Sequence, residues 1–339
     1  MNQIKVVSLP LKDVIYDFAK AFHTTYSENC NEYKVEIPAE WGTGYIKGMN
    51  FKEGLGILQY DCTFKNDLAV HFTVRQVHPL KFLYGIKGSF DHIFEKGEEV
   101  HEIEKYQGCI VASENHLGHV LRFKGGVHTI LSSLEIVRHD FRKQLACEFQ
   151  HTDATLHNIF KDRKAENAFF YKGFFSLQLY TIFQEIRDFQ QNDLIKKIFL
   201  EGKAYNILAQ QILEYYEDVN SEGNEPIIRQ KEVENISRIA NYIKTNLSTS
   251  QTVKALASQF GIPENKLQAG FKTLYGKTVN EYLQQQRLEV ALLLLKETEL
   301  NISEIVYKLG ISSRSYFSKI FKKEYGIAPS EFKKKGFSP

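Results

Sequence analysis

The sequence predicts an α+β protein in which a β-rich domain and a helical segment precede an all-helical C-terminal domain. Residues from about Trp41 to Val137 form short runs rich in β-branched and aromatic residues, whereas the hydrophobic period becomes helical from Arg138 onward. The charge changes too. From Arg229 to the end, 18 Lys and Arg face 10 Asp and Glu, a balance of +8, against −6 for the residues before it. A chain of 339 residues suits such a division into domains.

The β-rich domain is expected to cover residues 1–150 and to be an antiparallel sandwich or small barrel. Its strand-like runs are short and are bounded by Gly, Asn or Pro. About eight such runs, separated by turn signals, are typical of these architectures. The clearest runs cover residues 54–60, 68–74, 118–123 and 128–131.

Residues 151–219 are expected to form a helical segment. Helical patterns cover Asp153–Lys164, Ala168–Gln190 and Leu194–Glu217. The last pattern has an apolar stripe, which either pairs with the same helix of a second subunit or packs on its own domain. The stripe consists of Leu194, Ile198, Tyr205, Leu208, Ile212 and Tyr215. The stretch Val219–Pro226 is largely polar and contains Gly and Pro, so we expect a flexible linker over residues 220–228.

The remaining residues, 229–339, contain a repeated pattern. The stretch 256–262 is followed by Leu267 and Phe271, and the similar stretch 305–311 is followed by Phe317 and Phe321. Each copy predicts a short helix, a tight turn at glycine and a second short helix, because glycine readily adopts the left-handed conformation of a helix C-cap. The sequence therefore predicts two helix-turn-helix units.

The second helix of each copy presents polar groups on its outward face. This face carries Asn265, Gln268 and Lys272 in the first copy, and Arg314, Ser315, Lys319 and Lys322 in the second. Amides pair with adenine and cationic groups with guanine in the major groove of DNA. A plain helical hairpin with a solvated face is the alternative for one copy. Two copies in one basic domain favour DNA binding.

The segment between the two copies has the length of one DNA turn. Its helical pattern begins at Thr278 with capping-box spacing and continues to about Thr298. Some 20 residues at about 1.5 Å each give roughly 30 Å, against about 34 Å for one turn of DNA. Such a rod can place two reading helices in successive major grooves.

Over roughly Arg229–Lys335 the sequence resembles the AraC family of transcription regulators. The resemblance rests on three stretches: Arg287–Leu295, Ile302–Ser313 and Ser315–Lys333. It implies a seven-helix domain with two DNA readers. When the family's base-contacting positions are carried over to this sequence, the resemblance implies base contacts at Asn265, Gln268, Ala269, Arg314, Ser315 and Lys319. Phosphate contacts are expected at Lys272, Lys322 and Lys323. Ala269 departs from the cationic residue of some members, and Pro263 replaces a common N-cap serine.

The N-terminal half resembles the family's sensor arrangement more loosely, with a cupin-like β-domain followed by dimerising helices. The stretches Trp41–Gly44 and Phe199–Leu208 are similar to the subgroup that responds to iron-siderophore complexes. Aromatic walls with polar anchors suit a small-molecule effector, although the same aromatics could form the core. The candidate effector-binding residues are Trp41, Tyr60, Phe72, Arg75, His78 and Tyr84.

We interpret the sequence as that of a cytoplasmic, effector-controlled transcription activator that acts as a homodimer with double-stranded DNA and RNA polymerase. The longest apolar run, Val290–Leu295, is far shorter than the roughly 20 residues of a membrane span. No catalytic motif is present, so we expect no enzyme. His71, His78, His116 and His119 form no complete metal motif, and no metal or cofactor is assigned. An effector-independent regulator and a cupin-type metalloenzyme fused to a DNA-binding module are the alternatives.

Overall fold

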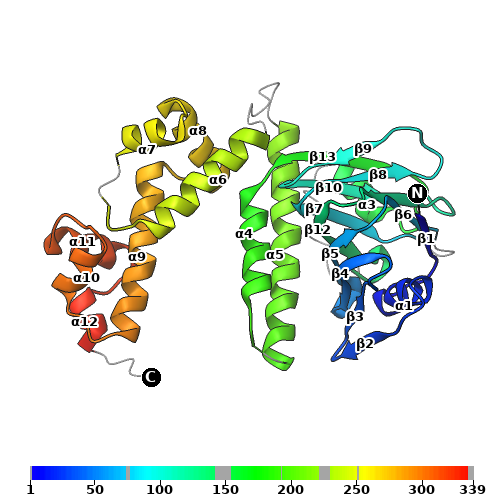
Figure 1. Cartoon of the computed structure of the whole chain (residues 1–339), viewed down its shortest axis with the longest axis horizontal. Coiled ribbons are helices and arrows are strands. Elements are labelled where there is room, and N and C mark those ends of the chain that lie inside the picture. The colour runs from blue at the N-terminus through cyan, green and yellow to red at the C-terminus, as the bar shows by residue number, and fades with distance from the viewer. Residues whose placement is uncertain are drawn as a thin grey trace. The chain divides into compact units, whose positions relative to one another are not determined.

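The structure is a computed structural model that describes residues 2–73, 77–141, 154–191, 193–220, 230–249 and 252–334. It divides into two compact units, Met1–Ile227 and Ile228–Pro339 (Figure 1). The first unit contains antiparallel sheets, and the described part of the second unit is helical, which confirms the α+β class. Of the expected linker over residues 220–228, only Asn220 is described, as the last residue of a helix; the rest lies outside the described residues.

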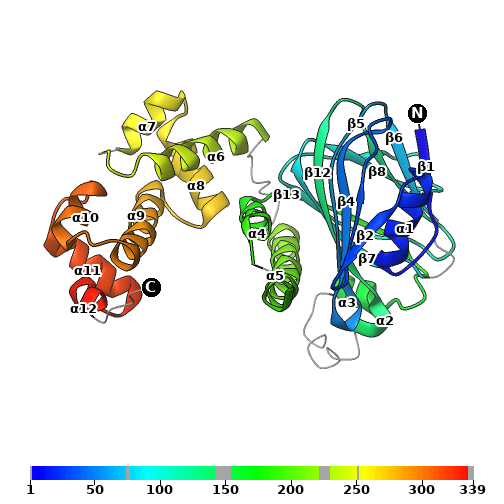
Figure 2. The same cartoon turned by 60° about the horizontal axis from the view of Figure 1, so that its bottom comes forward.

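The first unit is a sandwich of two sheets (Figure 2). The smaller sheet has the order β1-β6-β11-β8-β9 and the larger one β13-β10-β7-β12-β5-β4-β3-β2. Among the described strands, neighbours pair antiparallel except β1 and β6, which are parallel. The smaller sheet comprises β1 (Asn2–Val6), β6 (Leu68–Phe72), β8 (Phe90–Phe94), β9 (His101–Ile103) and β11 (His119–Phe123). The larger sheet comprises β2 (Tyr26–Asn29), β3 (Glu32–Glu36), β4 (Gly42–Asn50), β5 (Leu55–Phe64), β7 (Leu80–Lys87), β10 (Gln107–Ala112), β12 (His128–Ile136) and β13 (Phe169–Phe175).

The facing sides of the two sheets enclose a hydrophobic core. Strand β5 shows how the sequence builds it: Tyr60 and Cys62 are buried between the sheets, whereas the intervening Asp61 is partly exposed on the other side, because successive side chains of a strand point to opposite faces. Helix α1 (Leu11–Ala21) adds Ile15 and Phe18 to this core. This helix was not expected from the sequence.

A helical hairpin covers the outer face of the larger sheet (Figures 1 and 2). It consists of α4 (Leu177–Asp188) and α5 (Asp193–Asn220). Together with α3 (Ala154–Lys161), the hairpin forms a second core with outward side chains of the sheet. For example, Tyr84 of β7 stacks on Phe183 of α4 with ring centroids 5.2 Å apart. The larger sheet is therefore buried on both faces over part of its width.

The prediction of one helix over residues 168–190 is wrong for the first part of this range. Residues 169–175 form β13, which pairs antiparallel with the edge of β10. The run Phe-Phe-Tyr-Lys-Gly-Phe-Phe is rich in aromatic residues, which favour strands, and β10 offers it backbone hydrogen bonds that a helix would leave unused. The sheet thus extends beyond the expected boundary at residue 150, and the first unit includes the segment expected over 151–219.

The expected apolar stripe of α5 is divided between the core and the surface. Leu208 and Tyr215 are buried against the sheet, with 6% and 4% exposure. Leu194 and Ile198 are exposed, at 70% and 62%. The part of the stripe at Leu208 and Tyr215 therefore packs on its own domain, and the part at Leu194 and Ile198 leaves apolar side chains in solvent. Pairing with a second subunit stays a prediction.

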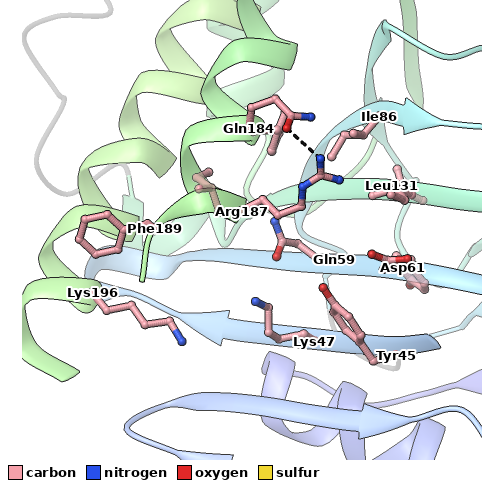
Figure 3. Close-up of a pocket in the computed structure, with 14 residues that line it drawn as sticks. Tyr45, Lys47, Gln59, Asp61, Ile86, Leu131, Gln184, Arg187, Phe189 and Lys196 are labelled. Carbon is pink, nitrogen blue, oxygen red and sulfur yellow. Dashed lines mark hydrogen bonds between the residues drawn. The ribbon is translucent and has the colours of Figure 1, made fainter. Parts of the chain in front are cut away.

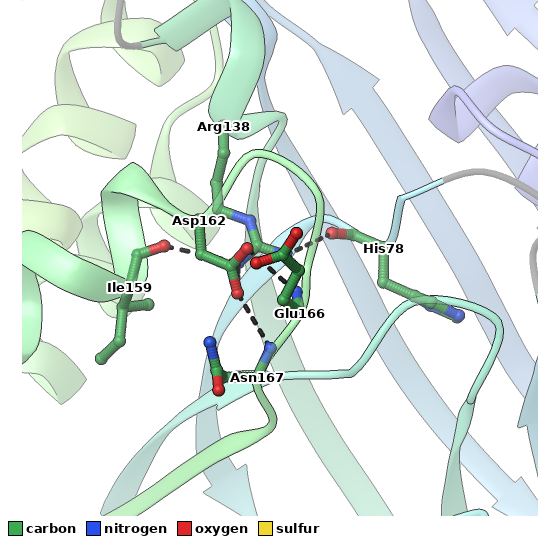
Figure 4. A network of polar contacts seen from close by, with 6 residues as sticks. All are labelled: His78, Arg138, Ile159, Asp162, Glu166 and Asn167. Atoms are coloured by element: carbon green, nitrogen blue, oxygen red, sulfur yellow. Dashed lines mark hydrogen bonds and ion pairs between the residues drawn. The ribbon is translucent and has the colours of Figure 1, made fainter.

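A buried arginine ties three segments together at one end of the sandwich (Figure 4). Arg138, in the short helix α2 (Arg138–Phe141), donates to the carbonyl oxygens of Ile159 at 3.4 Å and His78 at 3.2 Å. Asp162 lies 4.0 Å from the guanidinium and accepts the backbone amides of residues 166 and 167 at 2.9 and 3.0 Å. This network holds the backbone of His78 and the end of α3 together.

The described part of the second unit contains seven helices, as the resemblance implied. Leu267 and Phe271 of the first repeat, and Phe317 and Phe321 of the second, point into its core with 0% exposure. The helices are α6 (Gln230–Thr245), α7 (Val253–Phe260), α8 (Glu264–Tyr275), α9 (Val279–Glu297), α10 (Ile302–Lys308), α11 (Arg314–Tyr325) and α12 (Pro329–Lys334).

Candidate nucleic-acid interface and ligand cavity

Both helix-turn-helix units have the local chemistry that their sequence predicts. Thr252 caps α7 by accepting the amide of Ala255 at 3.1 Å. Asn301 caps α10, and its capping box with Glu304 is complete. The turns contain Gly261 with φ +64° and Gly310 with φ +61°, a conformation that glycine adopts without strain. The caps thus fix the start of the first helix of each unit, and the glycine turns connect it to the reading helix.

The reading helices α8 and α11 expose most of the residues expected to contact DNA. Asn265 and Ala269 on α8, and Arg314, Ser315 and Lys319 on α11, are exposed. The residues expected at phosphates, Lys272, Lys322 and Lys323, are exposed as well. Helix α11 therefore presents a cationic and hydroxyl-bearing face, whereas the face of α8 is mainly neutral.

Both amide side chains expected to contact bases on α8 already accept a backbone hydrogen bond: Asn265 accepts the amide of Lys266 at 2.9 Å, and Gln268 accepts an amide of the next helix. The side-chain oxygen of Gln268 accepts the backbone amide of Val279 at 3.2 Å. It thereby satisfies one of the amides that the first turn of a helix leaves unpaired, here at the start of α9. Asn265 differs from Gln268 in being exposed, whereas Gln268 is only partly exposed.

Helix α9 is the spacer between the two readers. Its 19 residues give a length of about 28 Å at about 1.5 Å each, close to the rod expected from the sequence. Arg287 anchors it: the guanidinium donates to the carbonyl oxygens of Leu247 at 2.9 Å and Thr249 at 3.3 Å. Arg287 therefore has a structural role in joining α9 to the segment before α7, through backbone carbonyls and not through an ion pair.

The residues expected to bind an effector do not surround one cavity. Tyr60 and Phe72 lie in the core between the sheets. Tyr84 lies on the opposite face of the larger sheet, where its hydroxyl donates to the carbonyl of Ser176. Trp41 is partly buried, packed on Phe22. Arg75 lies outside the described residues.

His78 belongs instead to a group of buried histidines inside the sandwich. The ring of His119 stacks on Phe72 at 4.9 Å and lies 5.9 Å from His78 and 5.4 Å from His92. Burial lowers the pKa of His78 to about 4 and that of His92 to about 3. Within the described residues, no set of three or more His, Cys, Asp and Glu is arranged to hold a metal ion.

A cavity of about 150 Å³ lies between the outer face of the larger sheet and the hairpin of α4 and α5 (Figure 3). Its walls are apolar where α4 meets the sheet, with Ile86, Leu131 and Phe183 among them. Its charged groups are Lys47, Asp61, Arg187 and Lys196. Sequence reasoning missed this cavity, since its residues come from four strands and two helices that are separate in the sequence.

The structure thus combines a β-sandwich unit that contains a cavity with a unit that carries two helix-turn-helix motifs. Residues 256–335 match the family described as "Helix-turn-helix domain", and residues 42–224 match "Regulatory protein PchR N-terminal domain". The chain belongs to the AraC family of transcription regulators, and its first unit to the PchR N-terminal domain family. None of the described helices is long and apolar enough to cross a bilayer.

Individual relatives match mainly the second unit. The transcriptional activator CfaD of Escherichia coli is 34% identical over 115 residues, which are 33% of this chain and 43% of CfaD. The probable transcription factor PqrA of Proteus vulgaris is 31% identical over 106 residues, 31% of this chain and 87% of PqrA. The C-terminal domain of the response regulator yesN from Fusobacterium nucleatum is 33% identical, with a TM-score of 0.28, over 29% of this chain and 95% of that one. The match spans less than half the length of CfaD.

Proposed function

We propose that this protein is a cytoplasmic transcription activator that binds specific DNA through α8 and α11 and responds to a small molecule bound in its first unit. The observation that carries the proposal is the pair of exposed reading helices joined by α9, whose length suits successive major grooves. The names of the relatives CfaD and PqrA, an activator and a probable transcription factor, support the same activity.

The base and phosphate contacts can be separated by their effects on binding. Arg314 begins α11 and is exposed, so it can donate two hydrogen bonds to one guanine. Replacing it with alanine should cost about 1–3 kcal/mol and relax the preference at one base pair. Lys322 lies two turns further along the helix. Its replacement with alanine should weaken all DNA sequences alike and reduce the salt dependence by about one ion.

The experiment is a genome-wide binding map to obtain the operator, followed by titration of labelled operator and scrambled duplexes at several salt concentrations. Lys296→Ala serves as the matched control, because this exposed lysine lies near the end of α9 and on neither reading helix. Equal affinity of the unaltered protein for operator and scrambled DNA, even at low salt, would refute specific binding. A uniform loss in Arg314→Ala would refute its role in base readout.

A homodimer through α5 is the second part of the proposal. The residues on one exposed face of this helix follow each other at intervals of three and four, the spacing of a two-stranded coiled coil. They are Ile195, Ile198, Gly202, Tyr205, Ala209 and Leu213. Ile195 and Leu213 are 59% and 54% exposed, and nothing lies within 4 Å of a Cβ placed on Gly202. A second copy of the helix would cover these apolar side chains.

Sedimentation of the full chain tests the dimer. Ile198→Glu should shift the protein towards the monomer, because two copies would bury like charges on facing helices. Leu293→Glu is the control, since Leu293 is similarly exposed, at 52%, but belongs to the second unit. A monomeric unaltered protein, or a dimer that Ile198→Glu leaves intact, would refute this interface.

The effector is proposed to act by binding one arrangement of the protein better than another, as a ligand must if it is to shift an equilibrium. An iron-siderophore complex is the proposed class, supported by the sequence resemblance of the first unit. In the active state the protein would recruit RNA polymerase. Thermal stabilisation by individual siderophore complexes tests the class, and an activator that needs none of them in reporter assays would favour the effector-independent alternative.

A further inference from the structure

We propose that the cavity between the larger sheet and the α4–α5 hairpin binds a small organic anion, with a carboxylate or phosphate group attached to one hydrophobic ring. The inference rests on the proposed function in one respect only, namely that this anion would be a ligand to which the regulator responds. Of the expected effector-binding residues that the structure describes, Tyr60 alone lines the cavity, from the sheet that forms its floor.

The first argument is the excess of cations around the cavity. Three cationic side chains line it, Lys47 from β4, Arg187 from α4 and Lys196 from α5, against one carboxylate, Asp61, among the described residues. Figure 3 shows that these cations approach the cavity from the sheet and from both helices. A concave surface with one predominant sign of charge attracts a counter-ion of opposite charge.

The second argument is that the nearby carboxylates are insufficient to neutralise the lysines. Glu32 of β3 is shared: it lies 2.9 Å from the ammonium of Lys196 and 4.0 Å from that of Lys47. Burial lowers the pKa of Lys47, against the opposite influence of Glu32. Lys47 is therefore a largely buried cation with an incomplete counter-charge, and a bound anion would supply the remainder.

The other charged groups support the same conclusion. Asp61 accepts a hydrogen bond from His128 at 2.7 Å, so its charge is directed to a partner outside the cavity lining. Among the described residues, Arg187 donates to one acceptor, the neutral side chain of Gln184, at 2.8 Å. Its planar guanidinium retains donors in the geometry that pairs with a carboxylate or phosphate. Lys47 and Arg187 are thus the two groups expected to hold the anion.

The size and walls of the cavity define the rest of the ligand. A cavity of about 150 Å³ has the volume that holds a benzene-sized ring in other proteins. Apolar side chains from the sheet and α4 provide the surface for such a ring: Ile86, Ile130, Phe183 and Ile186. The ligand is therefore amphipathic, with its ring on these walls and its charged group towards the cations.

The place of the cavity gives binding a structural consequence. The ligand would contact β4 and β5 of the sheet and also the facing ends of α4 and α5, where Phe189 stacks on Phe199 at 3.8 Å. It would therefore join the hairpin to the sheet at the end of α5 that carries Ile195 and Ile198. Ligand binding and the proposed dimer face would in this way share one helix.

The test uses the full chain and three probes: benzoate, phenyl phosphate and, as the uncharged control, benzyl alcohol. Binding is measured by calorimetric titration at constant ionic strength. Benzoate or phenyl phosphate should bind saturably to one site, at least tenfold more tightly than benzyl alcohol, and the tighter of the two identifies the charged group. Arg187→Gln and Lys47→Met should each weaken the anion about tenfold or more, because each removes a charge-assisted hydrogen bond.

Two further variants make the result specific. Lys47→Arg keeps the charge and should retain binding. Arg163→Gln removes an exposed arginine of the same unit outside the cavity and should change the affinity less than twofold. Absence of saturable anion binding, equal binding of benzyl alcohol, or undiminished binding in both Lys47→Met and Arg187→Gln would overturn the cavity proposal. Each of these outcomes leaves operator binding by the same protein intact, whereas loss of the proposed function is detected only in the operator titration.

Discussion

Replacing His92 by phenylalanine should make the first unit more resistant to acid. His92 lies inside the sandwich with 0% exposure, and neither ring nitrogen has a hydrogen-bond partner. Its ring is stacked among aromatic neighbours, including His119 at 5.4 Å and Phe170 at 5.3 Å. Burial, followed by the nearby His101 and Lys81, lowers the pKa of His92 to about 3.

The size of the effect follows from the difference in proton binding between the folded and unfolded chain. The pKa of an unfolded histidine is about 6.5, so between pH 6.5 and about 3 the unfolded state binds a proton that folded His92 does not. The free energy of unfolding is therefore unaffected above pH 6.5 and falls by about 1.4 kcal/mol per pH unit below it. At pH 5 the loss relative to pH 7 is about 2 kcal/mol. Phenylalanine cannot take up this proton.

At neutral pH the same substitution removes two unpaired buried nitrogens, which cost about 1–3 kcal/mol when left unsatisfied. The larger phenyl ring must fit the same space, which offsets part of this gain. The decisive quantity is therefore the change with pH in the difference between His92→Phe and the unaltered protein. That difference should grow in favour of the variant by about 2 kcal/mol from pH 7 to pH 5.

The assay is urea unfolding of the full chain at pH 7, 6 and 5, followed by tryptophan fluorescence. Trp41 is the one tryptophan of the sequence and packs on Phe22 in the first unit, so its emission reports this unit. His23→Phe is the control because His23 is exposed. A difference between variant and unaltered protein that stays constant within about 0.5 kcal/mol across this range would refute the reasoning, whatever its value at pH 7.

Further predictions concern single residues in both units. Gly310→Ala should destabilise the second unit by more than about 2 kcal/mol, because the added Cβ would lie 2.1 Å from a backbone oxygen. Gly261→Ala should cost about 1 kcal/mol, because open space surrounds this glycine. Hydrogen exchange in α10 and α7 measures both effects. Arg287→Gln should lower the melting temperature of the second unit and leave base preference unchanged in operator titrations. Burial raises the pKa of Glu214 to about 7, so its carboxyl stabilises the folded state less as pH rises from 4.5 to 7. The free energy of unfolding of Glu214→Gln, measured relative to the unaltered protein in urea, should therefore increase over this range, and a constant difference would contradict this.

The helix-turn-helix units could be predicted from the sequence because their determinants are local. Thr252 lies three residues from the amide that it caps, and Asn301 lies three residues from Glu304 in its capping box. Gly310 also lies close to the backbone of Ser248, but the sequence predicts the turn without knowledge of this contact. Short-range rules of this kind need no knowledge of the tertiary fold. The residues expected on the outward faces of α8 and α11 are exposed, except Gln268, which is partly exposed; their contacts with DNA stay a prediction.

The first unit could be predicted only in part, because its structure depends on pairing between distant segments. The aromatic run at residues 169–175 has a helical hydrophobic pattern, yet it becomes a strand because β10 offers an unpaired edge more than 50 residues away. The Lys81–Glu135 ion pair, at 2.8 Å between neighbouring strands, likewise depends on strand register. Register is not visible in a single sequence.

The same dependence explains why the expected effector residues and the observed cavity differ. Composition alone indicates which aromatic residues could line a ligand pocket. Alternation along each strand, however, places Tyr60 in the core between the sheets and Tyr84 against the hairpin. Loss of Tyr84 would remove its stacking on Phe183 and its hydrogen bond to Ser176. It would therefore disturb the packing of α4 before it disturbed a ligand. A defect in effector response after substitution at Tyr84 would thus identify the hairpin as the responsive element, and only substitutions such as Lys47→Met, whose side chain lines the cavity, can identify ligand contact.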